Sequence, residues 1–125
     1  MKTNSKKYID GFVIPIKKKD LGAYKKMAMW GADTWMKYGA LSYFECVGED
    51  LGVKSGMGMG FKKLAGLKPN ETVIFSFIVY KSKADRDRIN KKVMSDPSMK
   101  EFDEKSMPMD MRRFVCGGFD TLVEG

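Results

Sequence analysis

Four charged side chains lie within stretches that otherwise have the composition of β-strands: Asp10, Glu45, Arg112 and Arg113. A charge inside a strand needs a partner or water, so function could interrupt the folding pattern at these positions. In an enzyme, Glu45 would act as a general base and Arg112 would hold an anion. Salt bridges or charged sheet edges would explain the same residues without any chemistry.

Aromatic residues accompany Glu45 in this interpretation. Tyr43 lies two residues before Glu45, so both side chains point to the same face of a strand. Phe77 of a later strand can lie alongside, and Trp35 comes from a helix. Together with Asp10, these residues would line a substrate pocket with an apolar wall and a carboxylate, which is the usual form of a small-molecule site. The alternative is an ordinary aromatic core.

The sequence contains no histidine, which removes several classes of site. Ser-His-Asp and Cys-His catalysis are excluded, and so are metal and haem sites that need a histidine ligand. Asp85-Arg-Asp87 begins like a calcium loop, but Ile89 stands where an oxygen ligand belongs. The Gly-Met stretch at 56–60 lacks the ending of a phosphate-binding loop. No cofactor and no metal are therefore expected.

The composition is ordinary for a soluble globular protein, with 43% hydrophobic and 31% charged residues among 125. This length fits a single domain at 1–125. The net charge of +7 comes from scattered lysines without a long basic block, as on a solvated surface. No stretch approaches the ~18 apolar residues of a membrane helix, and no signal peptide is evident. We expect a cytoplasmic protein in which Cys46 and Cys116 are buried, reduced packing thiols.

The periodicity of apolar residues predicts the element order β-α-β-β-α-β. Ser82 and Asp85 form a capping box where the second helix begins. The segment 49–71 is long for a connection between neighbouring strands and is interpreted as a lid or an arm, with a short helix at 61–67. The strands are expected at 8–16, 41–47, 72–80 and 114–123, and the two main helices at 21–38 and 82–95.

Both faces of the predicted sheet are apolar. Two helices can cover only one face of four strands, and a soluble monomer avoids the large apolar patch that the other face would expose. A second copy packed sheet to sheet would cover this patch, which predicts a homodimer. The strand at 72–80 shows the pattern best, with Val73, Phe75, Phe77 and Val79 on one side and Ile74, Ile78 and Tyr80 on the other.

The element order is that of a ferredoxin-like α+β fold, with a four-stranded antiparallel sheet in the strand order 4-1-3-2. This order places Cys46 and Cys116 at opposite edges of the sheet, too far apart for a disulfide within one chain. It also makes the first and last strands neighbours, so that Asp10 could pair with Arg112 or Arg113.

Five stretches spread over nearly the whole chain resemble the bacterial YbaA-like family of unknown function. The resemblance implies a dimeric α/β-barrel of ferredoxin-like subunits and implies no activity. The stretches are Tyr8-Ile-Asp-Gly-Phe-Val-Ile-Pro, Gly39-Ala-Leu-Ser-Tyr-Phe-Glu-Cys-Val, Glu71-Thr-Val-Ile-Phe-Ser-Phe-Ile-Val-Tyr, Asn90-Lys-Lys-Val-Met-Ser-Asp-Pro and Met107-Pro-Met-Asp-Met-Arg-Arg-Phe-Val-Cys-Gly-Gly-Phe.

Three functions remain open on the sequence. The first is binding of a small apolar or aromatic metabolite between sheet and helices, with or without catalysis. The second is RNA binding, since the same element order occurs in RNA-recognition modules and Phe75 and Phe77 alternate as stacking aromatics would. The basic-Gly-aromatic opening of that motif is missing, so nucleic acid is less expected as a partner than a small molecule. The third is a non-catalytic structural or interaction dimer.

Overall fold

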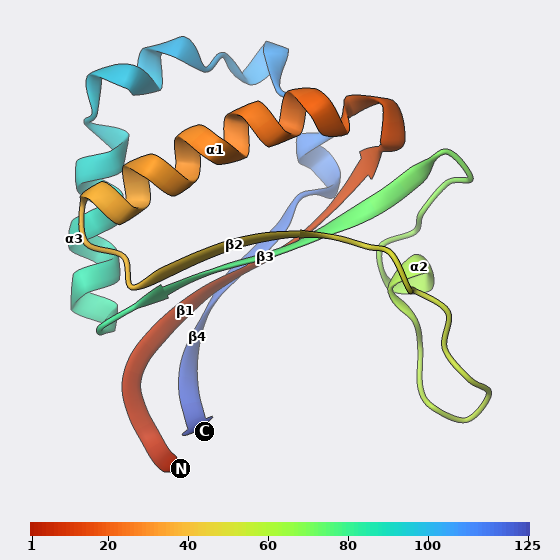
Figure 1. Ribbon diagram of the computed structural model, residues 1–125, viewed down its shortest axis with the longest axis horizontal. Helices are drawn as coiled ribbons and strands as arrows, with labels where there is room; N and C mark the ends of the chain where they lie inside the picture. The colour runs from red at the N-terminus through yellow and green to blue at the C-terminus, as the bar shows by residue number, and fades with distance from the viewer.

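A computed structural model describes residues 1–125, the side chain of Glu104 excepted. The chain has an α+β architecture in which a four-stranded antiparallel sheet carries its two long helices on one face (Figure 1). The elements are β1 (Lys2–Lys17), α1 (Leu21–Lys37), β2 (Ser42–Val47), α2 (Phe61–Leu64), β3 (Glu71–Tyr80), α3 (Lys83–Met94) and β4 (Val115–Glu124). None of the described helices combines the length and apolarity needed to cross a membrane.

The strands lie in the order β2-β3-β1-β4, which from the other edge is the 4-1-3-2 order expected from the sequence. β1 is central and pairs antiparallel with β3 and with β4. The register puts Glu45 opposite Ser76 and Asp10 opposite Ile78. These pairings bring the inner-facing side chains of β1, β2 and β3 under the two helices.

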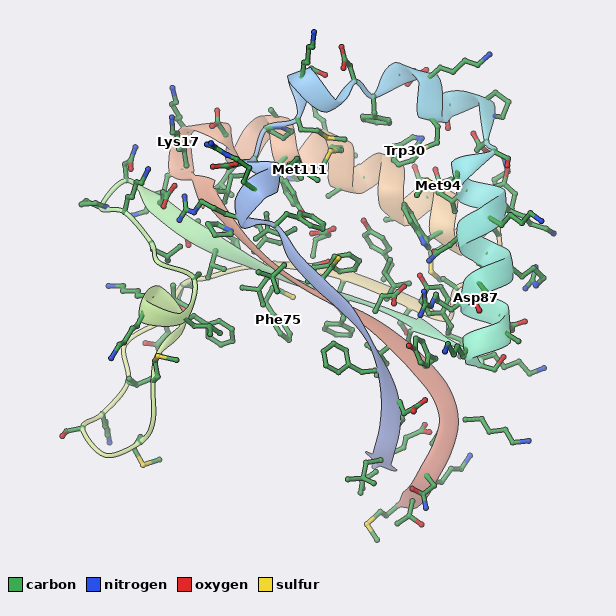
Figure 2. The ribbon with its side chains drawn as sticks, turned by 180° about the vertical axis from the view of Figure 1, so that it is seen from behind. Lys17, Trp30, Phe75, Asp87, Met94 and Met111 are labelled. Atoms are coloured by element: carbon green, nitrogen blue, oxygen red, sulfur yellow. The ribbon has the colours of Figure 1, made fainter. Side chains whose placement is uncertain are left out.

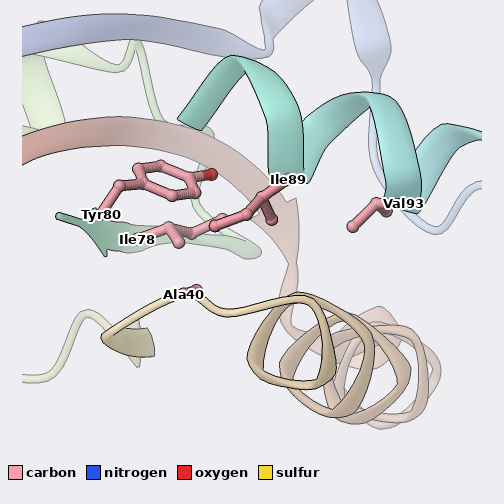
Figure 3. Packing of buried hydrophobic residues seen from close by; sticks show 5 residues of the cluster. All are labelled: Ala40, Ile78, Tyr80, Ile89 and Val93. Carbon is pink, nitrogen blue, oxygen red and sulfur yellow. The ribbon is translucent and has the colours of Figure 1, made fainter. Parts of the chain in front are cut away.

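The apolar core lies between the sheet and the helices. Ile89 and Val93 of α3 are fully buried against Ile78 and Tyr80 of β3 (Figure 3). The two residues are four positions apart, so they lie on one face of the helix. This face packs against the sheet. The helix begins as predicted, since the Ser82 hydroxyl accepts a hydrogen bond from the backbone N–H of Asp85 at 3.1 Å.

β1 is longer than predicted and reaches Lys2, beyond the part of the sheet that the helices cover. Its first residues pair with the end of β4, and the two strands leave the body of the protein as a ribbon that holds both termini (Figure 1). The register shifts between Ser5 and Tyr8, so a bulge separates the ribbon from the sheet.

Arg112 and Arg113 precede β4, as the strand bounds expected at 114–123 also place them, so their interpretation as charges within a strand is wrong. They belong to a 3-10 turn, Met111–Arg113, where the Asp110 carboxylate accepts the backbone N–H of Arg112 at 3.0 Å. An aspartate that captures this N–H competes with strand pairing and delays the start of the strand. The connection between α3 and β4 otherwise consists of two short 3-10 helices, Pro97–Glu101 and Glu104–Ser106.

The face of the sheet away from the helices, here called the outer face, is largely apolar. Its aromatic side chains are substantially exposed, at 52% for Phe44, 46% for Phe75 and 58% for Phe119. Cys46 is on this face and Cys116 is on the inner face, at opposite edges as predicted; both are exposed, so their interpretation as buried thiols is wrong. The outer face comprises Ile9, Gly11, Val13, Pro15, Lys17, Ser42, Phe44, Cys46, Glu71, Val73, Phe75, Phe77, Val79, Val115, Gly117 and Phe119.

Candidate functional site

A cavity of about 480 Å³ lies between the inner face of the sheet, the two long helices and the connection that precedes β4. Figure 2 shows Trp30, Met94 and Met111 on this side, with Phe75 on the other side of the sheet. The walls are largely apolar, and the charged residues among them are Asp10, Glu45 and Arg86. Six methionines, together called the methionine wall here, line the cavity: Met27, Met94, Met99, Met107, Met109 and Met111.

Glu45 of β2 lies in the cavity wall, where two phenols hold its carboxylate. The Tyr24 hydroxyl donates to Oε2 at 2.6 Å and the Tyr43 hydroxyl donates to Oε1 at 2.9 Å. Tyr43 reaches this position because Gly31 of α1 has no side chain, since a Cβ there would collide with the phenol oxygen. The glycine thus allows β2 and α1 to approach closely at the carboxylate.

Tyr24 and Tyr43 together form a clamp on the Glu45 carboxylate, and both phenols keep their protons. Burial, followed by the hydrogen bond to Glu45, raises the pKa of Tyr24 far above its usual range. The pKa of Tyr43 is also raised far above its usual range, mainly by burial and next by the charge of Glu45. An ionised carboxylate can only accept hydrogen bonds, so two neutral phenols are matched donors for it.

Aromatic rings form the wall beside the clamp. The rings of Trp35 and Tyr43 lie 6.1 Å apart, and Trp30 meets Trp35 edge to face at 6.0 Å. Each indole is held by its N–H, which Trp30 donates to Ser98 at 2.7 Å and Trp35 donates to Asn90 at 3.0 Å. These bonds fix the rings, and they also satisfy the indole donors without any ligand.

A second polar group, at Asp10 and Arg86, lies elsewhere in the cavity wall. The Arg86 Nε is 3.7 Å from an Asp10 carboxylate oxygen, and Arg86 also donates to the Tyr8 hydroxyl at 3.1 Å. The guanidinium carbon lies 4.8 Å from the centre of the Tyr8 ring. Asp10 therefore pairs with an arginine of α3, and the predicted pairing with Arg112 or Arg113 is wrong.

Tyr80 joins this polar group from β3. Its hydroxyl donates to Asn90 at 3.2 Å. Burial, followed by the charge of Asp10, raises the pKa of Tyr80 well above its usual range, so this phenol is also neutral. Tyr80 is thus a neutral neighbour of the Asp10–Arg86 pair, and the exposed carboxylate of Asp87 also approaches the Arg86 Nε, at 3.5 Å.

Of the residues predicted for the site, Glu45, Tyr43, Trp35 and Asp10 do line the cavity. Phe77 does not, because it is on the outer face, where its ring stacks on Phe44 at 5.0 Å.

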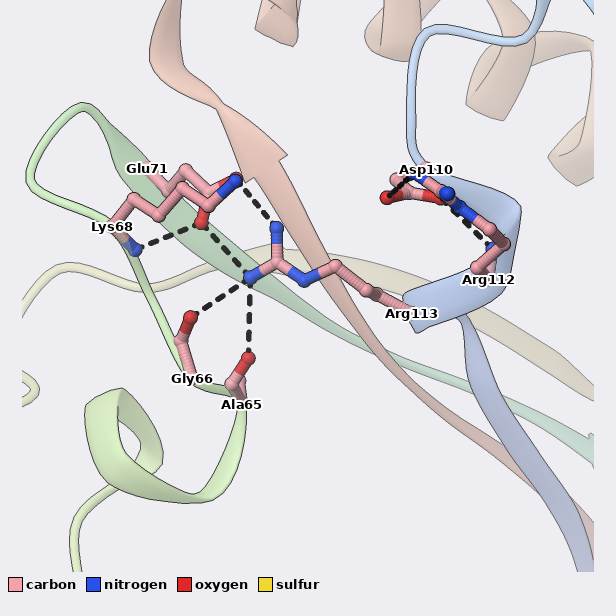
Figure 4. Close-up of polar contacts among 7 residues, drawn as sticks. All are labelled: Ala65, Gly66, Lys68, Glu71, Asp110, Arg112 and Arg113. Atoms are coloured by element: carbon pink, nitrogen blue, oxygen red, sulfur yellow. Dashed lines mark hydrogen bonds and ion pairs between the residues drawn. The ribbon is translucent and has the colours of Figure 1, made fainter.

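Arg112 is also outside the cavity. Its side chain is 91% exposed and pairs with Asp110, so the predicted role in holding an anion at Glu45 is wrong (Figure 4).

Arg113, next to it, forms a structural contact instead. Its guanidinium makes two bonds to the Glu71 carboxylate, at 2.7 and 2.9 Å, and donates to the carbonyl oxygens of Ala65 and Gly66 (Figure 4). The backbone N–H of Lys68 also donates to Glu71, at 2.8 Å. These bonds lower the pKa of Glu71 to about 2. They tie the end of the 49–71 segment to β3 and to the start of β4.

Three parts of the site were not predicted from the sequence: Tyr24, Arg86 and the methionine wall. Tyr24 and Arg86 fall within the helices expected at 21–38 and 82–95, but neither was named as a site residue. The wall had a visible signal, since Met107, Met109 and Met111 alternate in a segment without helical periodicity. Alternate residues of an extended chain share one side, and these three all line the cavity.

Comparison with known proteins supplies the family. Residues 7–111 match the family described as "Protein of unknown function (DUF1428)". The chain belongs to the DUF1428 family. It is also similar to the "Uncharacterized protein YbaA" of Escherichia coli strain K12, at 45% identity over 120 residues that cover 94% of this chain and 98% of that protein. The protein of the same description from Shigella flexneri matches to the same extent.

The DUF1428 match confirms the resemblance to YbaA-like proteins. It contains every charged residue of the cavity wall, from Asp10 through Glu45 to Arg86. The description of the family assigns no activity, so what this DUF1428 member does has to be argued from the cavity.

Proposed function

We propose that this protein binds a small apolar or aromatic compound in the cavity between its sheet and helices. The observation that carries the proposal is the cavity of about 480 Å³ with aromatic and aliphatic walls and a few polar groups. Small-molecule sites have this size and this composition, because apolar walls supply affinity and a few polar groups fix orientation. Of the two residues considered as catalytic, Glu45 alone lines the cavity, and the proposal is limited to binding.

The methionine wall supports a ligand of apolar character. Methionine is unbranched and polarisable, so it fills irregular gaps and contacts aromatic rings favourably. Met99, Met107, Met109 and Met111 come from the connection between α3 and β4, which has only short 3-10 helices. A wall of this kind can adjust to compounds of somewhat different shape.

Binding can be tested by two-dimensional NMR, with neutral aromatic compounds such as indole, tryptophol and naphthol added to the labelled protein. We expect chemical-shift changes at residues of the cavity wall. Ala28→Phe fills the cavity from α1 and should weaken binding by roughly tenfold or more. The control is Ala23→Phe, at an exposed position of the same helix that does not line the cavity. Equal affinity of both variants, or shift changes confined to the outer face, would contradict the proposal.

We also infer that the subunit is ferredoxin-like and pairs with a second copy through its outer face. The four strands and the two long helices in the order β-α-β-β-α-β support the first part. The outer face supports the second, because its charged residues as defined above, Lys17 and Glu71, lie together at one end, whereas large exposed aromatic side chains are present. A largely apolar surface of this kind matches another copy of itself.

The same feature weighs against RNA binding. Aromatic stacking could use Phe44, Phe75 and Phe77, but a nucleic-acid surface also needs cations for phosphates. The outer face offers only Lys17, at one end, among its defined residues. The prediction of a dimer can be tested by sedimentation of Phe44→Lys, which should be monomeric. Met29→Lys changes an exposed apolar residue on α1 and should stay dimeric. A monomeric wild-type protein would overturn this inference.

The cysteines support a reducing compartment. Cys46 and Cys116 are both exposed and unpaired, and they lie at opposite edges of the sheet. Exposed thiols persist in the cytoplasm, where glutathione and thioredoxin keep them reduced. We therefore propose a cytoplasmic location.

A further inference from the structure

The Glu45 carboxylate lacks a cationic partner. Among the described side chains, no lysine or arginine nitrogen lies within 4.0 Å of it. Glu45 is half-buried, whereas three carboxylates whose side chains are less exposed than 15% each have such a partner. Asp10 has Arg86, Glu71 has Arg113 and Asp96 has Lys37. Glu45 is therefore an exception to the way this protein compensates carboxylates in its interior.

The two phenols leave part of the Glu45 carboxylate unused. Each oxygen accepts one hydrogen bond, while a carboxylate has about four acceptor positions in total. Neutral phenols stabilise the charge but do not cancel it. The charged residues of the described cavity wall are Asp10, Glu45 and Arg86, so two negative charges and one positive charge leave a net charge of −1. An apolar cavity with a net negative charge attracts a cation and disfavours an anion.

The aromatic wall adds a second attraction for a cation. Trp35 and Tyr43 lie next to each other at the carboxylate, and Trp30 meets Trp35. The faces of such rings attract ammonium groups, most strongly for tryptophan. The indole N–H groups already donate to Ser98 and Asn90, so the rings offer their faces and edges to a ligand rather than a hydrogen bond.

We propose that the cavity binds an organic monocation, an amine with an apolar or aromatic body, whose ammonium group is held by Glu45 beside the rings of Trp35 and Tyr43. This inference rests on the proposed function and names the class of ligand. The ammonium group donates to the free acceptor positions of Glu45, and the body lies against the methionine wall. The charge of Arg86 is paired with Asp10 at 3.7 Å and its guanidinium donates to Tyr8, while its buried Nε makes no hydrogen bond.

The test uses three compounds that share an indole ring and differ in charge: tryptamine, tryptophol and indole-3-acetate. Dissociation constants are measured by NMR titration of the wild-type protein at low ionic strength. We expect tryptamine to bind at least about tenfold more tightly than tryptophol, with indole-3-acetate the weakest. Equal affinity for tryptamine and tryptophol would overturn this inference and leave the proposed function standing. An absence of shift changes in the cavity with all three compounds would overturn both.

A variant then locates the effect. Glu45→Gln keeps the shape of the side chain and removes its charge, so the preference for tryptamine should fall to about onefold while tryptophol binds as before. The same substitution at Glu49, an exposed residue beyond β2 that does not line the cavity, should leave the preference unchanged. A preference retained in Glu45→Gln would overturn the assignment. If this variant does not fold, the ratio in the wild-type protein still decides the inference.

Discussion

Two glutamates of the same sheet, Glu71 on β3 and Glu45 on β2, have very different surroundings. Glu71 receives both arms of the Arg113 guanidinium and a backbone N–H, and its side chain is 5% exposed. Glu45 receives two phenols and has no cation among the described residues. The first carboxylate is complete within the chain and holds the structure together. The second is complete only when a ligand supplies the missing positive charge.

The largest expected effect is a loss of stability, and it should be large when the contact of Glu71 is broken and small when Glu45 is changed. Arg113→Ala leaves Glu71 without its cation and releases the carbonyl oxygens of Ala65 and Gly66. We expect a loss of about 2–3 kcal/mol in the free energy of unfolding, below the full value for a buried pair because the arginine is 26% exposed. Glu45→Gln should cost less than about 1 kcal/mol, because the amide can still accept a phenol proton.

Urea unfolding measures both variants. Arg112→Ala is the matched control, since the neighbouring arginine pairs with Asp110 at the surface and should have no measurable effect. A larger cost for Glu45→Gln than for Arg113→Ala would break the distinction between the two glutamates.

The pH dependence of stability should depend on Glu71. Its pKa in the folded protein is about 2, below the ordinary value of 4.5, so its ionised form is favoured by folding. This contribution is fully present above about pH 4.5 and is lost as the pH falls toward 2. Glu71→Gln should therefore be less stable than the wild-type protein at pH 7, and the difference should shrink at pH 3. Urea unfolding at the two pH values measures it; a difference that is constant would contradict the contact with Arg113.

Two glycine substitutions in α1 test how closely this helix approaches the clamp around Glu45. Gly31→Ala places a Cβ against the Tyr43 hydroxyl and should destabilise the protein by about 1–2 kcal/mol. Gly22→Ala, near the start of the same helix, meets nothing within 4 Å and should be neutral or stabilising by up to about 1 kcal/mol. Gly31→Ala should therefore unfold at a lower temperature than Gly22→Ala, and equal unfolding temperatures would argue against the tight contact.

A smaller effect than that of Arg113→Ala should come from the loss of a single hydrogen bond of the clamp. Tyr24→Phe removes the 2.6 Å bond to Glu45, with an expected cost of about 1 kcal/mol. Because Tyr43 still donates, the remaining clamp keeps the carboxylate in place. A cost as large as that of Arg113→Ala, measured by urea unfolding, would show that Glu45 is a structural residue like Glu71.

The sequence was sufficient for much of this arrangement, because alternation along a strand is local. Tyr43 and Glu45 share a face by their spacing alone, and the helix that carries Trp35 had to cover one face of the sheet. The strand order also followed from the order of the elements.

What could not be predicted depends on contacts between elements. The register of β2 against β3 pairs Phe44 with Phe77 and Glu45 with Ser76. No tight turn specifies this register, because the long 49–71 segment joins the two strands, and Phe77 was therefore placed on the wrong face. Arg86 was missed because its partner Asp10 lies on a different element, 76 positions earlier in the chain.

The central claim, that Glu45 is left incomplete for a cationic ligand, is tested most directly by a crystal structure of the complex with tryptamine. We expect the amine nitrogen at about 2.7–3.2 Å from a carboxylate oxygen of Glu45. We also expect the indole ring inside the cavity, against the methionine wall. An amine nitrogen bound at Asp10 instead, or a ligand seated on the outer face, would contradict the account.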